Sequence, residues 1–301
     1  YDPIPWLNVL YRVGTDFYSD RRKQINAIGS WEANTIGRVY EEQINNKEVN
    51  SDLIATVNKD IAEGVNLSLT VGNNVNMREF QRLFVRGDGL TIPNFYNLSN
   101  ATSIITTELL DRERSVSLYY EARMEYKGIF FLSTTGRNDW TSTLPIDNRS
   151  FFYPSVSASF VLSEALGMSD NPILPYAKLR ASWARTGNGA PVYALQSVFV
   201  SSTPGDGWTD GLLFPLAGTI PAFTLSSVIG NPDLRPERTE AIEVGIDLKF
   251  LQNRMGIDFA YYDQVSTDQI FQQEFSAATG AVARLVNAGK ITNKGIELTA
   301  Y

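Results

Sequence analysis

Cysteine and histidine are both missing from the sequence of 301 residues. The absence of cysteine excludes a disulfide framework, a thiolate nucleophile and a cysteine-ligated metal. The absence of histidine excludes the Ser-His-Asp triad, histidine-ligated zinc and the most common general base. Carboxylate pairs occur at Glu41-Glu42 and at Glu121 with Glu125. Residues four apart on a strand are separated by about 13 Å, which is too far for glycoside hydrolysis, so we expect no enzymatic activity.

Long apolar runs are also missing. No stretch of about 18 consecutive apolar residues occurs, so a transmembrane helix is not expected. The chain opens with Tyr1-Asp2-Pro3, without the basic region and apolar core of a signal peptide, as a mature protein or a fragment would. Acidic residues outnumber basic ones, 33 against 26, and a net charge of −7 without a basic cluster makes nucleic acid a poor partner.

The sequence is rich in alternation with a period of two. Apolar residues occupy the even positions from Ile242 to Phe250, and Glu243, Gly245, Asp247 and Lys249 lie between them. A tight connection is expected at 251–254, after which alternation resumes over 256–262. This pattern predicts a long antiparallel hairpin with one apolar face and one charged face.

The stretch from Ser115 to Tyr126 is the clearest single strand. Its apolar set, which we expect to face lipid, is Val116, Leu118, Tyr120, Ala122, Met124 and Tyr126. Its alternate set, which we expect to face a wet interior, is Ser117, Tyr119, Glu121, Arg123 and Glu125. Strands of about ten residues match a tilted membrane-spanning strand, and a charged opposite face suits a polar lumen.

The connections between the expected strands sort by length. Short turns are expected at 2–5, 61–64, 127–128 and 251–254, with one of medium length at 163–175. Long loops are expected near 18–50, 78–112, 138–150, 186–237 and 267–293. Short turns at one end and long loops at the other are typical of an outer-membrane barrel whose long loops are extracellular. The sequence thus predicts an all-β fold in which residues 1–301 are part of one antiparallel up-and-down transmembrane β-barrel, with about ten spanning strands.

A soluble alternative stays open at this point. A β-sandwich also alternates, with its polar face toward water. The 14 Tyr, 16 Phe and 5 Trp suit interfacial girdles, but aromatic residues favour strands in general. A secreted sandwich adhesin would be soluble without detergent, which distinguishes it from a barrel segment.

Six motifs are distributed along nearly the whole chain. They are PWLNVLYRVGTDFYSDRR near the start, TTGRNDWTSTLP (134–145), NRSFFYPSVSASFVLSE (148–164), KLRASWARTGN (178–188), NPDLRPERTEAIEVGIDLKF (231–250) and VNAGKITNKGIEL (286–298). The fifth is similar to a loop-to-strand motif found across TonB-dependent receptors. The others resemble the SusC-like, or RagA-like, branch of the TonB-dependent outer-membrane transporters of Bacteroidetes-type bacteria.

The resemblance implies an about 22-stranded barrel with an N-terminal plug inside it. Neither a plug nor a TonB box is apparent in this sequence, so we expect a middle slice of the barrel. The implied function is nutrient uptake, in which an oligosaccharide or oligopeptide is captured outside and admitted when TonB moves the plug. Inward charges such as Glu121, Arg123, Asp247 and Lys249 would hold the plug and line a wet path.

The resemblance also implies partners. These are a SusD-like lipoprotein lid, TonB with ExbB and ExbD through the plug, outer-membrane lipid, and a second SusC–SusD pair in a dimer. The alternative is a SusC-like barrel that acts as a scaffold subunit of a larger outer-membrane complex. A stable complex with proteins other than a SusD-like lid and TonB would favour the scaffold.

Polar loop residues are expected to order loops rather than to bind a ligand. This applies to Asn138-Asp139-Trp140 and Asn148-Arg149, because Asn and Asp cap turns. Pro232, Pro236 and Glu237 are expected to fix how the chain re-enters the barrel. The substrate-binding residues stay unassigned.

The Gly-rich loop PGDGWTDG offers the one candidate for a bound ion. Asp206 and Asp210 could supply oxygen ligands to calcium, although the EF-hand pattern is incomplete. Trp208 between them suits stacking on a sugar or a partner as well as ordinary loop packing. GNGAP (187–191) lacks the Gly-Lys-Ser/Thr ending of a phosphate loop, and no other cofactor is expected.

Overall fold

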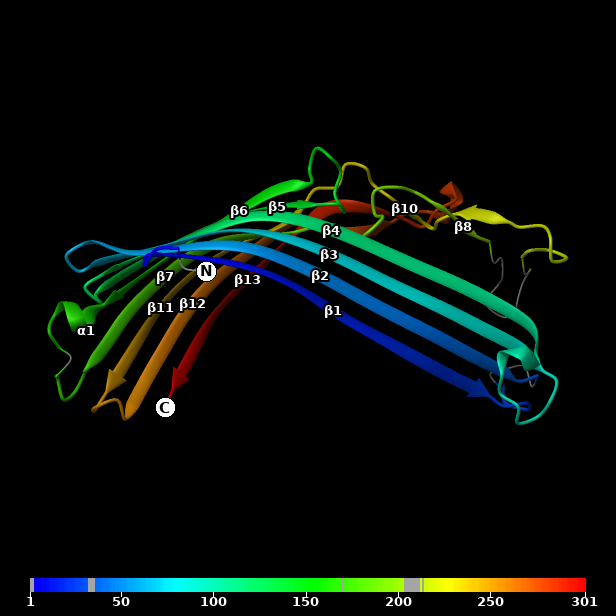
Figure 1. Cartoon of the computed structure of the whole chain (residues 1–301), viewed down its shortest axis with the longest axis horizontal. Coiled ribbons are helices and arrows are strands. Elements are labelled where there is room, and N and C mark those ends of the chain that lie inside the picture. Colours follow the sequence, from blue (N-terminus) through cyan, green and yellow to red (C-terminus); the bar gives the residue numbers. More distant parts are fainter. Residues whose placement is uncertain (1–2, 32–35, 169, 203–211, 213) are drawn as a thin grey trace. The chain divides into compact units, whose positions relative to one another are not determined.

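The computed structural model describes residues 3–31, 36–168, 170–202, 212 and 214–301, and most of them lie in strands (Figure 1). The long strands are β1 (Leu7–Asn26), β2 (Arg38–Ala62), β3 (Val65–Leu90), β4 (Ala101–Tyr126), β5 (Phe130–Thr141), β6 (Ser150–Val161), β7 (Tyr176–Asn188), β11 (Glu237–Phe250), β12 (Met255–Glu274) and β13 (Ala283–Ala300). The short elements are η2 (Leu98–Asn100), α1 (Leu162–Ala165), β8 (Phe199–Ser201), β9 (Phe223–Leu225), β10 (Val228–Ile229) and η3 (Ala277–Thr279). Among the described residues, no helix has the length and apolar character needed to cross a membrane.

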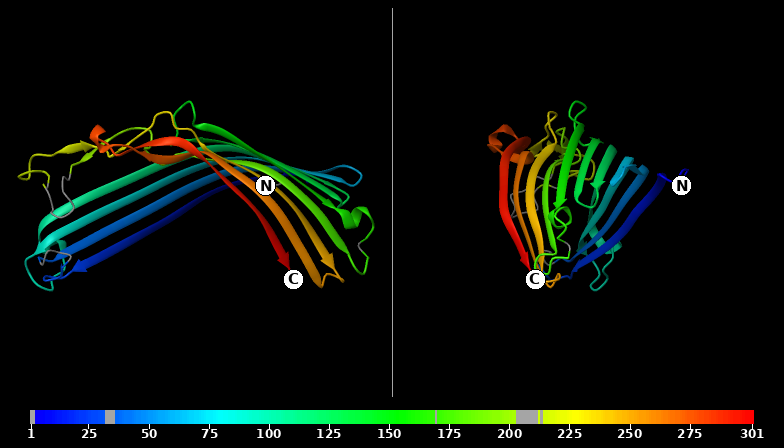
Figure 2. Two further views of the ribbon diagram at one scale, coloured as in Figure 1. Left: turned by 180° about the vertical axis from the view of Figure 1, so that it is seen from behind. Right: turned by 90° about the vertical axis from the view of Figure 1, so that its left-hand side faces the viewer.

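The long strands follow one another in a single sheet, in the order β1-β2-β3-β4-β5-β6-β7-β11-β12-β13, with β10 added beside β13. Neighbours from β5 to β13 pair antiparallel, and Figure 2 shows these strands side by side. β8 and β9 form a separate two-stranded sheet. The predicted up-and-down topology with about ten spanning strands is confirmed.

Three of the short connections, between β2 and β3, β4 and β5, and β11 and β12, are where the sequence predicts them. Lys127 and Gly128, between β4 and β5, both have positive φ, 51° and 70°. Two consecutive residues with positive φ are typical of the type I′ turn, whose twist matches that of the flanking strands. Four residues, 251–254, join β11 to β12, and Gly64 supplies a φ of 72° at the β2–β3 turn.

Three of the five predicted long loops are wrong in extent. β1 continues to Asn26, β2 already begins at Arg38, and β12 continues to Glu274, so large parts of 18–50, 78–112 and 267–293 are strand. The reason is that these stretches carry polar side chains on both faces. Alternation reveals a strand only when one of its faces is apolar, so hydrogen-bonded strand with two polar faces is indistinguishable from loop in the sequence.

Contacts divide the chain into two compact units, and one of them consists of Tyr11–Leu53 and Asn74–Val116. Cross-strand ion pairs hold this unit together, including Arg21 with Glu41 (3.0 Å) and Arg112 with Glu79 (2.8 Å). Asn76 and Asn50 donate hydrogen bonds to the Glu48 carboxylate, at 2.6 and 3.1 Å. Polar cross-strand pairs therefore add to the few buried apolar residues of this unit, such as Val39 and Leu90.

The other unit consists of Tyr1–Leu10, Ile54–Asn73 and Ser117–Tyr301, and its sheet has one apolar face. Directly paired residues lie on the same face of a sheet. One unbroken apolar row crosses six strands: Phe130, Phe160, Leu179, Ile246, Phe259 and Leu298. The next row is Leu132, Ala158, Ala181, Val244, Tyr261 and Ile296. These rows form one apolar face of the sheet, which is bounded on β11 by Ile242 and Phe250. We call this face the apolar band.

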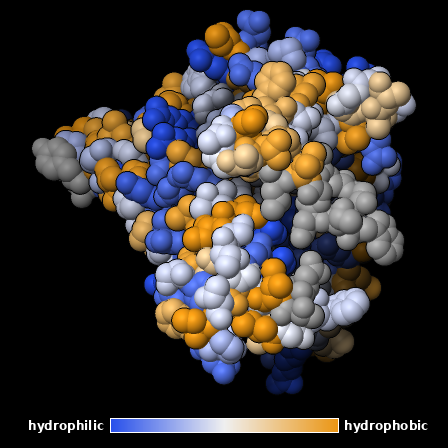
Figure 3. Space-filling view, turned by 90° about the vertical axis from the view of Figure 1, so that its right-hand side faces the viewer, coloured by the Kyte–Doolittle hydropathy of each residue, from blue (hydrophilic) through white to orange (hydrophobic). Residues whose placement is uncertain are grey.

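The apolar band remains exposed in this unit. Ile296 and Leu298 are 70% and 67% exposed, and Ile242 is 53% exposed. The sheet from β5 to β13 is a single layer (Figures 1 and 2), and these three side chains are exposed among the described residues. Figure 3 shows hydrophilic and hydrophobic side chains interspersed on the face of the molecule that it presents. A soluble sandwich would bury its apolar face against a second sheet.

Candidate functional site on the polar face of the sheet

Arg180 on β7 is the centre of the charged face opposite the apolar band. Its guanidinium donates two hydrogen bonds to Asp258 on β12, at 2.6 and 2.8 Å. It also forms an ion pair with Glu243 on β11, at 3.6 Å. A two-pronged bond between guanidinium and carboxylate fixes both side chains in orientation. These residues therefore make a rigid polar patch across three strands.

Gly245 is the residue that allows Arg180 to reach Asp258. The two strands β7 and β12 are not neighbours, and Gly245 on β11 lies directly between Arg180 and Ala260. A Cβ atom at Gly245 would lie 2.7 Å from the Arg180 guanidinium. The missing side chain thus provides the passage across β11.

We expect Gly245→Val to break this bridge. The branched side chain would displace the Arg180 guanidinium and leave Asp258 without its partner, at a cost of up to about 1 kcal/mol, because the ion pair is partly exposed to solvent. Urea unfolding of the whole protein in lipid vesicles measures the loss. Ala241→Val, on the same face of β11, is the matched control, and an equal loss in both variants would contradict the bridge.

A hollow of about 510 Å³ opens on this polar face. Its charged lining residues are Arg123, Glu125, Lys178, Arg180 and Glu243. Asn66, Ser68, Ser133, Ser157, Ser159 and Ser182 supply its amide and hydroxyl groups. The wall therefore offers donors and acceptors of both signs, which suits a hydrated, hydrogen-bonding ligand or a polar protein surface.

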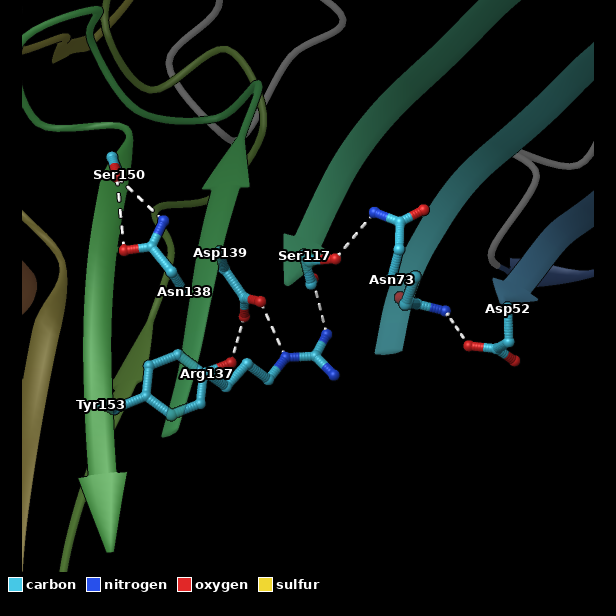
Figure 4. Close-up of polar contacts among 9 residues, drawn as sticks. Asp52, Asn73, Ser117, Arg137, Asn138, Asp139, Ser150 and Tyr153 are labelled. Atoms are coloured by element: carbon cyan, nitrogen blue, oxygen red, sulfur yellow. Dashed lines mark hydrogen bonds and ion pairs between the residues drawn. The ribbon is translucent and has the colours of Figure 1, made fainter. Parts of the chain in front are cut away.

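A second polar group surrounds Arg137 on β5 (Figure 4). Arg137 donates to Asp139 at 2.7 Å and to the hydroxyl of Ser117 on β4 at 2.7 Å. Tyr153 on β6 donates to the same Asp139. The guanidinium also lies 5.7 Å from the ring centre of Tyr119, within cation–π range. Three strands are thereby connected on the polar face.

The structure confirms the predicted alternation on β4. Tyr120 packs on the apolar side, because a Cβ atom at Gly136 would meet its ring at 2.4 Å. Ser117 and Tyr119 contact Arg137 on the opposite side, and Arg123 lines the polar hollow. Glu121 forms an ion pair with Arg123 at 2.7 Å. One detail differs, since Ser117 is fully buried beneath its neighbours rather than open to a wet interior.

The other two predicted inward charges lie on β11. Lys249 places its ammonium 4.8 Å from the ring centre of Tyr176. Asp247 lies opposite Lys178 on one side and Asp258 on the other. Both therefore lie on the polar face, as predicted, while Arg180 and Asp258 were not among the predicted residues.

Three of the family-like motifs meet in one buried cluster. Leu234, from NPDLRPE, is 0% exposed and packs with Leu144, Ala190 and Ala194. Phe151, Leu195, Ile270 and Leu285 pack around this core. The cluster therefore joins three connecting segments: the one before β6, the one after β7 and the one before β11. It also packs them against the C-terminal end of β12 and the N-terminal end of β13.

Hydrogen bonds fasten the same segment. Asn148 donates to the carbonyl of Leu234 at 3.1 Å. Asn287 accepts from the Arg235 amide at 2.8 Å and donates to the Arg235 carbonyl at 2.7 Å. Glu237 accepts from the amide of Ile270 at 2.8 Å. The prediction that Asn148 and Glu237 order the chain is confirmed by these bonds, and Asn287 is a further fastening residue.

The remaining loop predictions have different outcomes. Asn138 donates to Ser150 at 3.0 Å and Asp139 is held by Arg137, so both order the β5–β6 end as predicted. Asp206, Trp208 and Asp210 lie outside the described residues, so the calcium prediction stays untested. Among the residues that the structure describes, no group of three or more acidic side chains could hold a metal ion.

Solved structures share this fold. The structure of the RagAB peptide transporter superimposes with a TM-score of 0.83 at 18% sequence identity, over 99% of this chain and 32% of that chain. The ferripyoverdine receptor of the outer membrane of Pseudomonas aeruginosa has a TM-score of 0.55 at 14% identity, over 97% of this chain and 36% of that chain. A likeness at such low identity shows the fold alone.

Curated proteins are also similar in sequence. The TonB-dependent receptor P26 of Formosa agariphila is 25% identical over 274 residues, which cover 87% of this chain and 26% of that protein. The TonB-dependent receptor P3 of the same organism is 23% identical over 202 residues, which cover 66% of this chain and 19% of that protein. The chain thus spans about a quarter or less of these relatives.

A family match covers almost the whole chain. Residues 2–301 match the family described as TonB dependent receptor-like, beta-barrel. The two-faced single-layer sheet agrees with this match, and the sandwich alternative does not. The chain therefore belongs to the TonB-dependent receptor-like β-barrel family and lies in the outer membrane.

Proposed function

We propose that this chain is part of the barrel wall of a SusC-type TonB-dependent importer of oligosaccharides or oligopeptides. The observation that carries the proposal is the pairing of the apolar band with a charged face that holds a hollow of about 510 Å³. Such a sheet can face hydrocarbon on one side and a wet path on the other. We propose no enzymatic role for the chain.

The polar wall suits uptake of hydrogen-bonding solutes. Its charges are largely paired, as in Arg180 with Asp258 and Arg123 with Glu121, so the wall presents donors and acceptors with little net charge. Serine hydroxyls from β6 and β7 lie between these pairs in the hollow. Sugar hydroxyls and peptide amides are the groups that such a surface can bind and release.

We assign the proposed partners to the charged face of the sheet and to the end that carries the long β7–β11 connection. The charged face of β7, β11 and β12 would contact a plug, and TonB with ExbB and ExbD would move that plug. A SusD-like lipoprotein would cover the end of the barrel that carries the long β7–β11 connection. The resemblance of the motifs to the SusC-like branch supports this arrangement.

Uptake by intact cells tests the proposal. Cells that produce the whole protein should accumulate a labelled oligopeptide or oligosaccharide mixture, and accumulation should stop when TonB is deleted. Uptake that persists without TonB would contradict the proposal. A stable complex with proteins other than a SusD-like lid, together with no TonB-dependent uptake, would favour a scaffold role instead.

A further inference from the structure

On the lipid-facing side of the sheet, the rows of paired residues at and beyond the border of the apolar band contain charged side chains. Trp183 and Ile242 pair directly, and this row ends with Asp263 and Lys294. The next row contains Arg185 and Glu240, followed by Val265 and Thr292. The row after that contains Arg238, Thr267 and Lys290. Because paired residues share a face, all these side chains lie on the side of the apolar band.

Four basic residues on this side form a compact group, which we call the basic strip: Arg185, Arg238, Lys290 and Lys294. Successive rows are about 6.6 Å apart along a strand, and strands β11 and β13 are about 10 Å apart. The long side chains of Arg238 and Lys290 flank Thr267 and can therefore converge on one small anion.

Two members of the basic strip are neutralised and two are not. Arg185 forms an ion pair with Glu240 at 2.5 Å, and Lys294 forms one with Asp263 at 2.8 Å. Arg238 and Lys290 are exposed, and no acidic side chain in the described part of the chain pairs with either. The basic strip therefore carries two positive charges without an acidic partner, on Arg238 and Lys290. These two residues are in the row that is farthest from the apolar band.

We propose that the basic strip binds the phosphate of an anionic membrane lipid. The acyl chains of such a lipid would lie on the apolar band, and its phosphate would reach Arg238 and Lys290. Trp183 lies at the border, with its ring centre 5.8 Å from the Arg185 guanidinium. An aromatic ring beside a basic group is common where a protein meets the lipid headgroups.

The position of the strip favours a lipid over a free anion. The strip is continuous with the apolar band on the same face, so a ligand that has both acyl chains and phosphate gains from both surfaces. Free phosphate would gain from the charges alone and would be bound weakly in water.

Lipid binding by the whole protein in neutral detergent micelles tests the proposal. The probe is phosphatidylglycerol, and bound lipid is measured by native mass spectrometry across a concentration series. The double variant Arg238→Gln, Lys290→Gln should bind about 30-fold more weakly, as expected for two basic residues near a lipid surface. The charge-matched control is Lys47→Gln, Arg284→Gln, which should bind as the parent does.

Lipid comparison, salt dependence and competition by phosphate distinguish lipid binding from binding of a free anion. Phosphatidylcholine should bind more weakly than phosphatidylglycerol in the parent, and raised salt should reduce the difference. Competition by inorganic phosphate as effective as competition by phosphatidylglycerol would overturn the lipid assignment. Equal binding by the double variant and the control would overturn the site. Far-ultraviolet circular dichroism confirms that both variants are folded, and TonB-dependent uptake is measured separately, so either proposal can fail alone.

Discussion

Ile246→Arg is expected to destabilise the protein by about 2–4 kcal/mol in a bilayer. Ile246 lies in the middle of an apolar row that crosses six strands, between Leu179 and Phe259. Apolar rows lie on both sides of it, so a guanidinium there is far from either water interface. The cost arises because the charge loses its hydration in hydrocarbon.

Urea unfolding in phosphatidylcholine vesicles measures this cost. Ser157→Arg is the matched control, because Ser157 is exposed and pairs with Ser182 on the polar face. Its cost should be much smaller. Ser117 is unsuitable as a control, since it is fully buried under Arg137. Equal costs for Ile246→Arg and Ser157→Arg would contradict the assignment of the two faces.

Leu234→Ala is expected to cost about 2–5 kcal/mol, the range for a fully buried leucine. Leu234 is 0% exposed in the cluster that joins three of the family-like motifs. Its removal leaves a cavity that Leu144 and the two alanines are too short to fill. We expect the segment around Asn231–Glu237 to open locally, because the cluster is its main apolar contact.

Hydrogen exchange of the backbone amides over 231–237 measures this opening. The Arg235 amide, bonded to Asn287, should lose most of its protection in the variant. Leu166→Ala is the control, since Leu166 is 66% exposed and should change exchange little. Unchanged protection at Arg235 in Leu234→Ala would show that the hydrogen bonds hold the segment without the cluster.

The sequence was sufficient for the parts of the fold that have one apolar face. The hairpin of β11 and β12, the turn at Lys127-Gly128 and the face of Tyr120 all follow from alternation or turn chemistry. The extents of β1 to β4 could not be predicted, because their polar stretches have no alternation. Cross-strand ion pairs such as Arg112 with Glu79 depend on register, which the sequence does not display.

The sequence predicted which face of the sheet carries the charged residues of the candidate site, but not which of these residues contact one another. Alternation placed Arg123, Asp247 and Lys249 on the polar face. It could not show that Arg180 crosses a whole strand to reach Asp258, because that contact depends on how β7, β11 and β12 are aligned. Gly245 was the available signal, since a glycine inside a strand often marks a close approach by another group.

The cluster around Leu234 has a consequence for how this chain can diverge. It fastens the connection between β7 and β11 at both ends, through Ala190 and Ala194 on one side and Leu234 on the other. The part of the connection between Ala194 and β10 can be lengthened, shortened or exchanged without disturbing the alignment of β7 with β11, since a longer closed loop costs little additional entropy. Descendants of this chain can therefore acquire new surfaces between β7 and β11 while the strands beneath them are inherited unchanged.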